Sequence, residues 1–200
     1  GNPRNEFLAT TKRYKNFVLR LEYRLVGTEG FVNGGVQFRS VRVTQPPNEM
    51  SGYQADIGAG YSGSLYDESR RKKFLAEASD AEKLKASLKP DGWNELVVRC
   101  VGPRIQIWVN GVATVEYTEA DAQIARTGIL GLQIHGGPPA EASYRITSSG
   151  ASAFLRPIYK NAAEERATVY SRGKAGETTL EELAREAERA GLSDTVVINS

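Results

Sequence analysis

Residues 105–117 read IQIWVNGVATVEY, two runs rich in β-branched and aromatic residues on either side of Asn110-Gly111. Asparagine and glycine tolerate positive φ angles, and a two-residue hairpin turn of the commonest type requires such angles at both central positions. The alternation of apolar residues on each side fits two strands that each bury one face. The stretch therefore predicts an antiparallel hairpin and favours an all-β fold class.

Five further segments carry strand signals, and turn residues recur about every ten residues between them. In the clearest of them, residues 17–25, apolar side chains at every second position alternate mostly with charged ones. The others are residues 34–39, 52–57, 93–100 and 129–135. Several such strands with no long helix among them predict a β-sandwich or a barrel, and we favour a sandwich of the jelly-roll type.

Composition excludes several classes of protein. The 200 residues include 26 basic and 24 acidic side chains, so the net charge of +2 gives no field that would attract nucleic acid. No apolar run approaches the ~20 residues that a membrane helix needs, and we expect no membrane partner. Cys100 is the only cysteine, which rules out an intrachain disulfide and leaves the compartment open. Because the chain starts at Gly1-Asn2-Pro3 without a charged and then apolar leader, we expect any signal peptide to have been removed or to lie outside this sequence.

Residues 67–89 interrupt the strand pattern with a charged, alanine-rich run. We expect a long excursion with a short helical turn, which either carries binding residues or is a solvated connection. Residues 147–152 (TSSGAS) have the composition of a linker. The sequence therefore divides into a sandwich domain at residues 1–146 and an extension at residues 147–200.

The extension contains the clearest helix signal in the chain, over residues 178–190. Thr178 and Glu181 form a capping box, and Gly191 supplies a C-terminal stop. The helix carries a narrow apolar stripe that needs a packing partner, so oligomerisation through this helix is one expectation. Residues 196–198 (VVI) are expected to add a further strand.

Strand parity gathers polar side chains on one face of three predicted strands. Residues two positions apart in a strand point the same way, and the polar pairs are Gln37 with Arg39, Gln54 with Asp56, and Gln133 with His135. If these strands are neighbours in one sheet, their side chains form a concave patch that can bind vicinal hydroxyls. Four aromatic residues could supply platforms for sugar rings, with packing in the core or at an edge as the alternative; they are Tyr53, Tyr61, Tyr66 and Trp108.

His135 is the only histidine, and it lies in the sequence Gln-Ile-His-Gly-Gly. Imidazole titrates closest to neutrality among the side chains, so a histidine in a polar cleft suits a general base or a metal ligand. The two glycines that follow let a ligand approach the backbone closely. A structural histidine is the competing interpretation.

Three segments carry a resemblance to a known family: residues 34–39 (GGVQFR), residues 52–57 with 63–68 (GYQADI and GSLYDE), and residues 131–137 (GLQIHGG). Together they resemble the 3-keto-disaccharide hydrolase family of concanavalin A-like domains, over roughly residues 5–146. The resemblance implies a jelly-roll β-sandwich, a carbohydrate partner, and a periplasmic or secreted location. It also implies that His135 belongs to a sugar site.

The ends of the sequence depart from the family pattern. Members usually open with a segment rich in Trp, Asp and Gly, which is absent from this sequence. They usually close with a further strand. Here Tyr144-Arg145-Ile146 matches the start of that strand, but the residues that follow do not match the family pattern. Residues 154–170 or residues 196–198 are expected to supply the missing strand.

The family resemblance also implies a reaction. A ketone at carbon 3 of a glycoside acidifies the proton on carbon 2, so that a base can remove this proton and expel the group on carbon 1 before water adds back. In this hypothesis His135 is the base or a metal ligand, Asp56 is its partner or a second acid–base group, and Arg39 stabilises the developing charge. The predicted substrate-binding residues are Gln37, Tyr53, Gln54, Tyr61, Tyr66, Asp67, Trp108 and Gln133. A divalent metal held by His135, Asp56 and Glu68 is a further alternative, based on one histidine and scattered carboxylates.

Other classes of function compete with this hypothesis. A standard glycosidase with two carboxylates is disfavoured, because Gln54-Ala55-Asp56 offers an amide where an acid would be needed. A non-catalytic carbohydrate-binding module could use the same patch without turnover. A structural or interaction domain could instead dock through the helix at residues 178–190.

Overall fold

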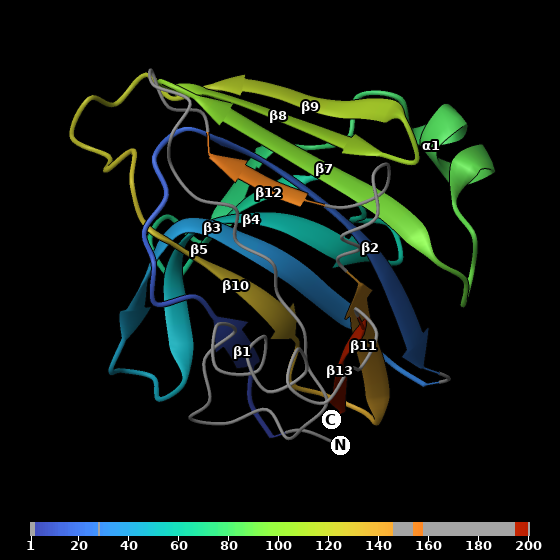
Figure 1. The fold of residues 1–200 in the computed structure, drawn as a ribbon. Coiled ribbons are helices and arrows are strands. Elements are labelled where there is room, and N and C mark those ends of the chain that lie inside the picture. The colour runs from blue at the N-terminus through green and yellow to red at the C-terminus, as the bar shows by residue number, and fades with distance from the viewer. Residues whose placement is uncertain (1–2, 28, 146–153, 158–194, 200) are drawn as a thin grey trace.

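The computed structural model describes residues 3–27, 29–145, 154–157 and 195–199, which form two antiparallel sheets packed face to face (Figure 1). The first sheet has the order β1 (Glu6–Ala9), β10 (Ile129–Ile134), β3 (Asn33–Val43), β4 (Glu49–Gly58), β5 (Leu65–Glu68) and β6 (Lys73–Ala76). The second has the order β13 (Thr195–Asn199), β11 (Ala140–Arg145), β2 (Phe17–Gly27), β7 (Asn94–Val101), β8 (Arg104–Val109) and β9 (Val112–Thr118), and β12 (Phe154–Pro157) also pairs with β2. The predicted all-β sandwich is confirmed.

The core lies between the two sheets because alternate residues of each strand face inward. On β2, Phe17, Leu19 and Leu21 are buried, whereas the residues between them are partly exposed. From the facing sheet, β3 contributes Val36 and Phe38. The rings of Phe17 and Phe38 meet edge to face with centroids 6.3 Å apart. Each buried apolar side chain of this size stabilises the fold by about 1.5–3 kcal/mol.

The predicted hairpin is confirmed in its turn as well as in its strands. Val109 pairs with Val112, and Asn110 and Gly111 have φ angles of 48° and 78°. The side-chain Oδ1 of Asn110 also accepts a hydrogen bond of 2.8 Å from the backbone N–H of Glu95, which ties the turn to β7. Asparagine therefore contributes both its tolerance of positive φ and a contact to the neighbouring strand.

Residues 67–89 contain more strand than the sequence pattern predicts. β5 and β6 form a hairpin at the edge of the first sheet, and the expected short helix follows as α1 (Ala81–Ser87). Asp80 caps this helix by accepting a hydrogen bond of 3.2 Å from the backbone N–H of Lys83, and Leu84 is buried. The two short strands were missed because each spans only four residues and lacks clear alternation.

Both segments proposed for the closing strand contribute one. β13 confirms the strand expected at residues 196–198 and pairs with β11, while β12 pairs with β2. The linker at residues 147–152 and the helix at residues 178–190 lie outside the described residues. Among the helices that are described, none is long and apolar enough to cross a membrane.

The single cysteine lies in the middle of the core. Cys100 belongs to β7, and its side chain is fully buried among the apolar residues of the sandwich. Burial raises the pKa of the Cys100 thiol to about 12, because the thiolate would lose its hydration there. At neutral pH Cys100 therefore acts as a small apolar side chain.

Candidate functional site

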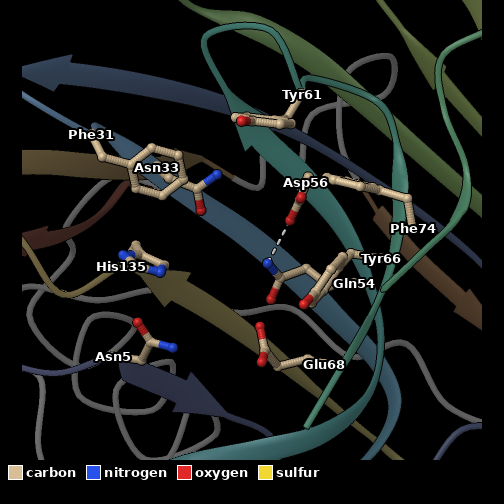
Figure 2. A pocket seen from close by; sticks show the side chains of 10 residues that line it. All are labelled: Asn5, Phe31, Asn33, Gln54, Asp56, Tyr61, Tyr66, Glu68, Phe74 and His135. Carbon is tan, nitrogen blue, oxygen red and sulfur yellow. Dashed lines mark hydrogen bonds between the residues drawn. The ribbon is translucent and has the colours of Figure 1, made fainter. Parts of the chain in front are cut away.

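A pocket of about 280 Å³ lies on the outer face of the first sheet, the face directed away from the core (Figure 2). It is positioned mainly by β4 and β5, where Gln54 pairs with Tyr66, and where Asp56 and Glu68 belong to the same face. The ends of β3 and β10 add further side chains. The complete lining consists of Asn5, Phe31, Asn33, Gln54, Asp56, Tyr61, Tyr66, Glu68, Phe74 and His135.

The position of the Gln54 side chain at the floor of the pocket depends on a glycine, Gly35, on the neighbouring strand. Gly35 lies opposite Asp56 in the pairing of β3 with β4. A Cβ atom added to Gly35 would lie 2.6 Å from Cδ of Gln54, so the amide of Gln54 occupies the space that glycine leaves open. From there Gln54 Nε2 donates a hydrogen bond of 2.6 Å to Asp56 Oδ1. The glycine thus lets a buried amide hold the carboxyl group in place.

Two carboxyl groups in this pocket hold protons up to about neutral pH. Burial raises the pKa of Asp56 to about 7, against the opposing effect of the hydrogen bond from Gln54. Burial also raises the pKa of Glu68 to about 7, with a contribution from the negative charge of Glu49. Carboxyl groups with such pKa values can donate or accept a proton under physiological conditions, and such groups cluster at functional sites.

Replacing Asp56 by asparagine is expected to stabilise the protein more at pH 8 than at pH 4. A raised pKa in the folded state means that the unfolded chain releases its proton first, so stability falls as pH rises from about 4 to about 7. Asparagine does not titrate, and its Oδ1 can still accept from Gln54. Urea unfolding of both proteins at the two pH values measures the difference. The same difference at pH 4 and pH 8 would contradict a raised pKa for Asp56.

His135 directs one of its two ring nitrogens at the backbone of the next residue. Its Nδ1 lies 2.5 Å from the carbonyl oxygen of Gly136, which can only accept, so the proton belongs on Nδ1. In the neutral ring Nε2 then carries the lone pair. The backbone N–H of His135 donates to Asn33, and the N–H of Gly136 donates to the side chain of Asn5, which fixes the loop beneath the imidazole.

An aromatic wall, made of Phe31, Tyr61, Phe74 and Tyr66, borders the pocket. Tyr61 and Phe74 stack with centroids 5.5 Å apart and an interplanar angle of 7°, and Tyr66 meets Phe74 edge to face. Phe31 is 48% exposed and Tyr61 38% exposed, although large aromatic side chains usually pack inside. Exposed rings beside a polar floor suit a ligand with both apolar and hydroxyl-bearing faces.

Comparison with known proteins identifies the family. Residues 1–146 match the model of the 3-keto-alpha-glucoside-1,2-lyase-like domain. The chain belongs to this domain family. The resemblance predicted from the three sequence segments is thereby confirmed. No match was found among curated proteins.

Solved structures support the same fold. The carbohydrate-binding module CBM66 from Bacillus subtilis is similar with a TM-score of 0.57 and 14% identity, covering 78% of this chain and 84% of that chain. A "Putative glycosyl hydrolase" from Parabacteroides distasonis is similar with a TM-score of 0.50 and 18% identity, also covering 78% and 84%. At these identities the similarity bears on the fold and not on the ligand.

Five of the residues predicted for the sugar site line the pocket. These are Gln54, Asp56, Tyr61, Tyr66 and His135. Gln37 and Gln133 occupy the same face of the sheet but are fully buried beside the pocket. Gln37 donates to Gln54, whereas within the described residues the side-chain nitrogen and oxygen of Gln133 have no hydrogen-bond partner.

The predicted placement of Arg39 is wrong because β3 is irregular at that position. The register between β3 and β4 shifts between Phe38 and Val41, and Arg39 has a φ angle of 48°. The side chain of Arg39 is buried and donates through Nε and Nη2 to the carbonyl oxygen of Lys15, at 3.0 and 2.6 Å. Ser40, rather than Arg39, reaches the outer face and contacts Gln37. Arg39 therefore does not line the pocket.

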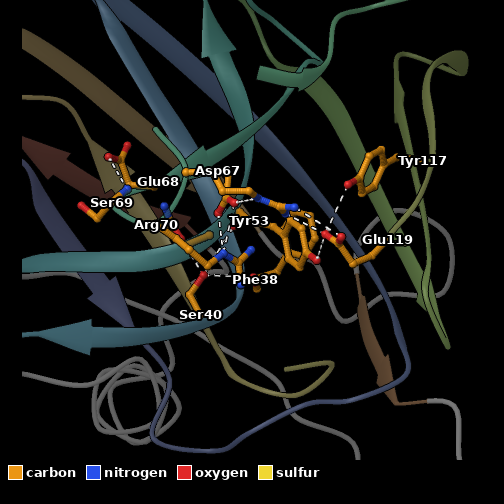
Figure 3. Close-up of polar contacts among 11 residues, drawn as sticks. Phe38, Ser40, Tyr53, Asp67, Glu68, Ser69, Arg70, Tyr117 and Glu119 are labelled. Atoms are coloured by element: carbon orange, nitrogen blue, oxygen red, sulfur yellow. Dashed lines mark hydrogen bonds and ion pairs between the residues drawn. The ribbon is translucent and has the colours of Figure 1, made fainter. Parts of the chain in front are cut away.

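Three more predicted residues lie outside the pocket. Tyr53 points into the core, where its ring stacks on Phe38 at 5.7 Å (Figure 3). Asp67 pairs with Tyr53 across β4 and β5 and is fully buried in ion pairs (Figure 3). Trp108 belongs to the second sheet and alternates on β8 with buried neighbours, so it faces away from the core. For Tyr53 the alternative of packing in the core therefore applies, and neither Asp67 nor Trp108 lines the pocket.

Several pocket residues were not among the predicted sugar-binding residues. Asn33 has the same strand parity as Gln37, so the alternation contained a usable signal for it, whereas Glu68 belongs to β5, a strand that the sequence pattern did not predict. Three pocket residues carry no such signal, because only the folded chain brings them to the pocket. Asn5 directly precedes β1, Phe31 precedes β3, and Phe74 belongs to the edge strand β6.

The residues considered for a divalent metal do not fit one. His135, Asp56 and Glu68 face the same pocket. In the described part of the chain, however, no three histidine, cysteine or carboxylate side chains lie close enough together to hold an ion. A structural or catalytic metal site normally gathers at least three protein ligands. We therefore derive no reaction step through a metal.

Proposed function

We propose that this pocket is an active site that cleaves 3-keto-glycosides. The observation that carries the proposal is that His135, Asp56 and Glu68 share one pocket with an aromatic wall. The pocket thus combines a nitrogen base, two carboxyl groups that titrate near neutrality, and a surface for a sugar ring. Membership in the 3-keto-alpha-glucoside-1,2-lyase-like domain family supports this choice of substrate.

The first step removes the proton on carbon 2 of the sugar. Nε2 of His135 takes this proton, and the electron pair of the C–H bond moves into a carbon–carbon double bond while the C3 ketone becomes an enolate. The N–H groups of Gln54 and Asn33 are the donors that would stabilise the enolate oxygen. They replace Arg39, which the sequence had suggested for this role and which lies outside the pocket.

The second step expels the group on carbon 1. The enolate re-forms the ketone, a double bond forms between carbons 1 and 2, and the bond from carbon 1 to the leaving oxygen breaks. Asp56 or Glu68 in its protonated form supplies the proton that this oxygen needs. Addition of water to the new double bond would complete a hydrolysis, and release of the unsaturated ketone would complete a lyase reaction.

Two finer expectations accompany the proposal. We infer that the sandwich is a concanavalin A-like jelly roll, in keeping with its two antiparallel sheets and its similarity to CBM66. We also infer a periplasmic or secreted location from the family to which residues 1–146 belong. Fractionation of cells that produce the protein tests the second inference.

The proposal is tested by turnover of a 3-keto-glucoside that carries a chromogenic aglycone. The parent glucoside, which has a hydroxyl at carbon 3, serves as the matched control because its carbon 2 proton is not acidified. We expect release of the aglycone from the ketone alone, with and without a chelator. Equal release from both glucosides would contradict an elimination, and no release from either would contradict catalysis on this substrate class.

A carbohydrate-binding module is the second candidate function. The observation that favours it is the exposure of Phe31 and Tyr61, which resembles a binding platform more than a closed reaction chamber. This candidate predicts that sugars bind without turnover and that Phe31→Ala and Tyr61→Ala each weaken binding. Calorimetric titration with glucosides measures the affinity. Turnover that is lost in a His135 variant would decide against it.

A further inference from the structure

A line of four buried polar side chains runs beneath the pocket and ends at Asp56. Ser40 Oγ donates to Gln37 Oε1 at 2.6 Å, Gln37 Nε2 donates to Gln54 Oε1 at 2.9 Å, and Gln54 Nε2 donates to Asp56 Oδ1 at 2.6 Å. All four side chains are at most 5% exposed. The last two of them, Gln54 and Asp56, line the pocket and belong to the proposed chemistry, whereas Ser40 and Gln37 do not.

We propose that Ser40 and Gln37 are positioning residues that hold the amide of Gln54 with its N–H toward Asp56, so that this carboxyl group is directed into the pocket and its ionisation is favoured against the effect of burial. This inference rests on the proposed function only in that Asp56 is taken to be an acid–base group.

The direction of the line follows from hydrogen-bonding capacity. Asp56 in its ionised form only accepts, so Gln54 turns its N–H toward Asp56 and its carbonyl oxygen toward Gln37. Gln37 must then donate to that oxygen and present its own carbonyl oxygen to Ser40. The hydroxyl of Ser40 completes the line by donating to Gln37 Oε1 at 2.6 Å, a closer acceptor than the carbonyl oxygen of Phe38 at 3.0 Å. Each link fixes the orientation of the next, and a missing link would allow the amides to rotate.

The backbone next to these four hydrogen-bonded side chains lacks the side chains that would collide with them. A Cβ atom on Gly35 would lie 2.6 Å from the side chain of Gln54, and a Cβ atom on Gly52 would lie 2.3 Å from Oγ of Ser40. Ser40 itself reaches the outer face only because β3 is irregular between Phe38 and Val41. Two glycines and a strand irregularity therefore accommodate the same set of hydrogen bonds.

Near Asp56, N–H donors rather than positively charged side chains are placed to stabilise the ionised carboxyl group. Glu68 and Tyr66 face it from β5, His135 from the end of β10, and Tyr144 from β11 through the sheet. No lysine or arginine is among the described residues that line the pocket. Burial opposes ionisation of Asp56, and the hydrogen bond from Gln54 is the contact that favours it.

The test is a titration of the Asp56 carboxyl carbon by ¹³C NMR in the full chain, for the wild type, Gln37→Met and Ser40→Ala. Losing one link should raise the titration midpoint of Asp56 by about half a pH unit to one unit, since a neutral hydrogen bond contributes about 1 kcal/mol. The matched control is Gln133→Met, which removes a buried amide of the same face that has no hydrogen bond within the described residues. It should leave the midpoint unchanged.

A second measurement uses the wild type alone, so the inference can be tested even if the variants do not fold. The side-chain amide signals of Gln54 and Gln37 should both shift with the midpoint of Asp56, while those of Gln133 should not. Unshifted signals of Gln37, or a midpoint unchanged in both line variants, would overturn the inference. Because neither readout needs a substrate, either result stands apart from whether the protein cleaves a 3-keto-glucoside.

Discussion

The variant His135→Ala is expected to cleave a 3-keto-glucoside about 10²- to 10⁴-fold more slowly than the wild type, with sugar binding largely retained. Its Nε2 is the nitrogen that the proposed reaction uses as base, because Nδ1 is directed at the carbonyl of Gly136. The loss should appear in kcat and in kcat/KM to a similar degree, since the proton transfer belongs to the transition state and not to the bound ground state.

The measurement pairs steady-state release of a chromogenic aglycone with calorimetric binding of the unoxidised glucoside. Val41→Ala serves as the control, since Val41 is an exposed apolar residue of the same sheet that does not line the pocket. Circular dichroism verifies that both variants are folded. An unchanged kcat in His135→Ala would show that another group is the base, and loss of binding with kcat intact would assign His135 to substrate binding.

The second large effect is expected on stability, from Arg71→Met. Arg71 forms ion pairs with Asp67 and with Glu119, the latter at 2.7 Å, and so joins β5 of one sheet to the segment after β9 of the other. Tyr53 also donates to Glu119, at 2.7 Å (Figure 3). Both carboxylates are buried, and removing one partner of a buried ion pair typically costs about 3–5 kcal/mol. Arg70 still pairs with Asp67, so we expect a loss of about 3 kcal/mol.

The same substitution elsewhere provides the control. Arg104→Met removes an ion pair with Glu116 in which both side chains are at least half exposed, so the expected loss is below about 1 kcal/mol. Urea unfolding followed by far-ultraviolet circular dichroism at pH 7 measures both variants. Equal losses would show that burial of the Arg71 cluster adds nothing to its stabilising effect.

Acid should reduce the cost of Arg71→Met. Burial alone would raise the pKa of Glu119, but hydrogen bonds from Arg71 and Tyr53 outweigh it and lower this pKa to about 2. A lowered pKa stabilises the folded state above the unfolded value near 4.5, and this contribution is lost as pH falls toward 2. The difference between wild type and variant should therefore shrink between pH 5 and pH 3. A constant difference over this range would contradict the assignment.

The sequence predicted the strands better than the side chains that they direct outward. Asn110-Gly111 and the alternation in residues 17–25 indicate the sandwich because turn chemistry and strand periodicity are local properties. Parity also separates Tyr53 from Gln54, so the exclusion of Tyr53 from the pocket could have been predicted. Arg39 could not be placed in this way, since an irregular strand position shifts the alternation without a sequence signal.

The remaining pocket residues depend on contacts between distant parts of the chain. Asn5 and His135 are 130 positions apart, and the short strand β1 brings them together by pairing with β10. Phe31 precedes β3, and it meets His135 edge to face at 5.0 Å only after the sheet has formed. Such contacts follow from tertiary packing, which the local sequence pattern does not predict.

Because its single cysteine is buried between the two sheets, labelling of this thiol can report transient opening of the sandwich. A thiol reagent cannot reach Cys100 while the two sheets are in contact, and the high pKa of this thiol suppresses the reactive thiolate. The rate of labelling in native buffer therefore measures how often the sandwich separates. No reporter has to be introduced for this purpose. The ion-pair variants could thus be ranked by their opening frequency under conditions in which every one of them is folded.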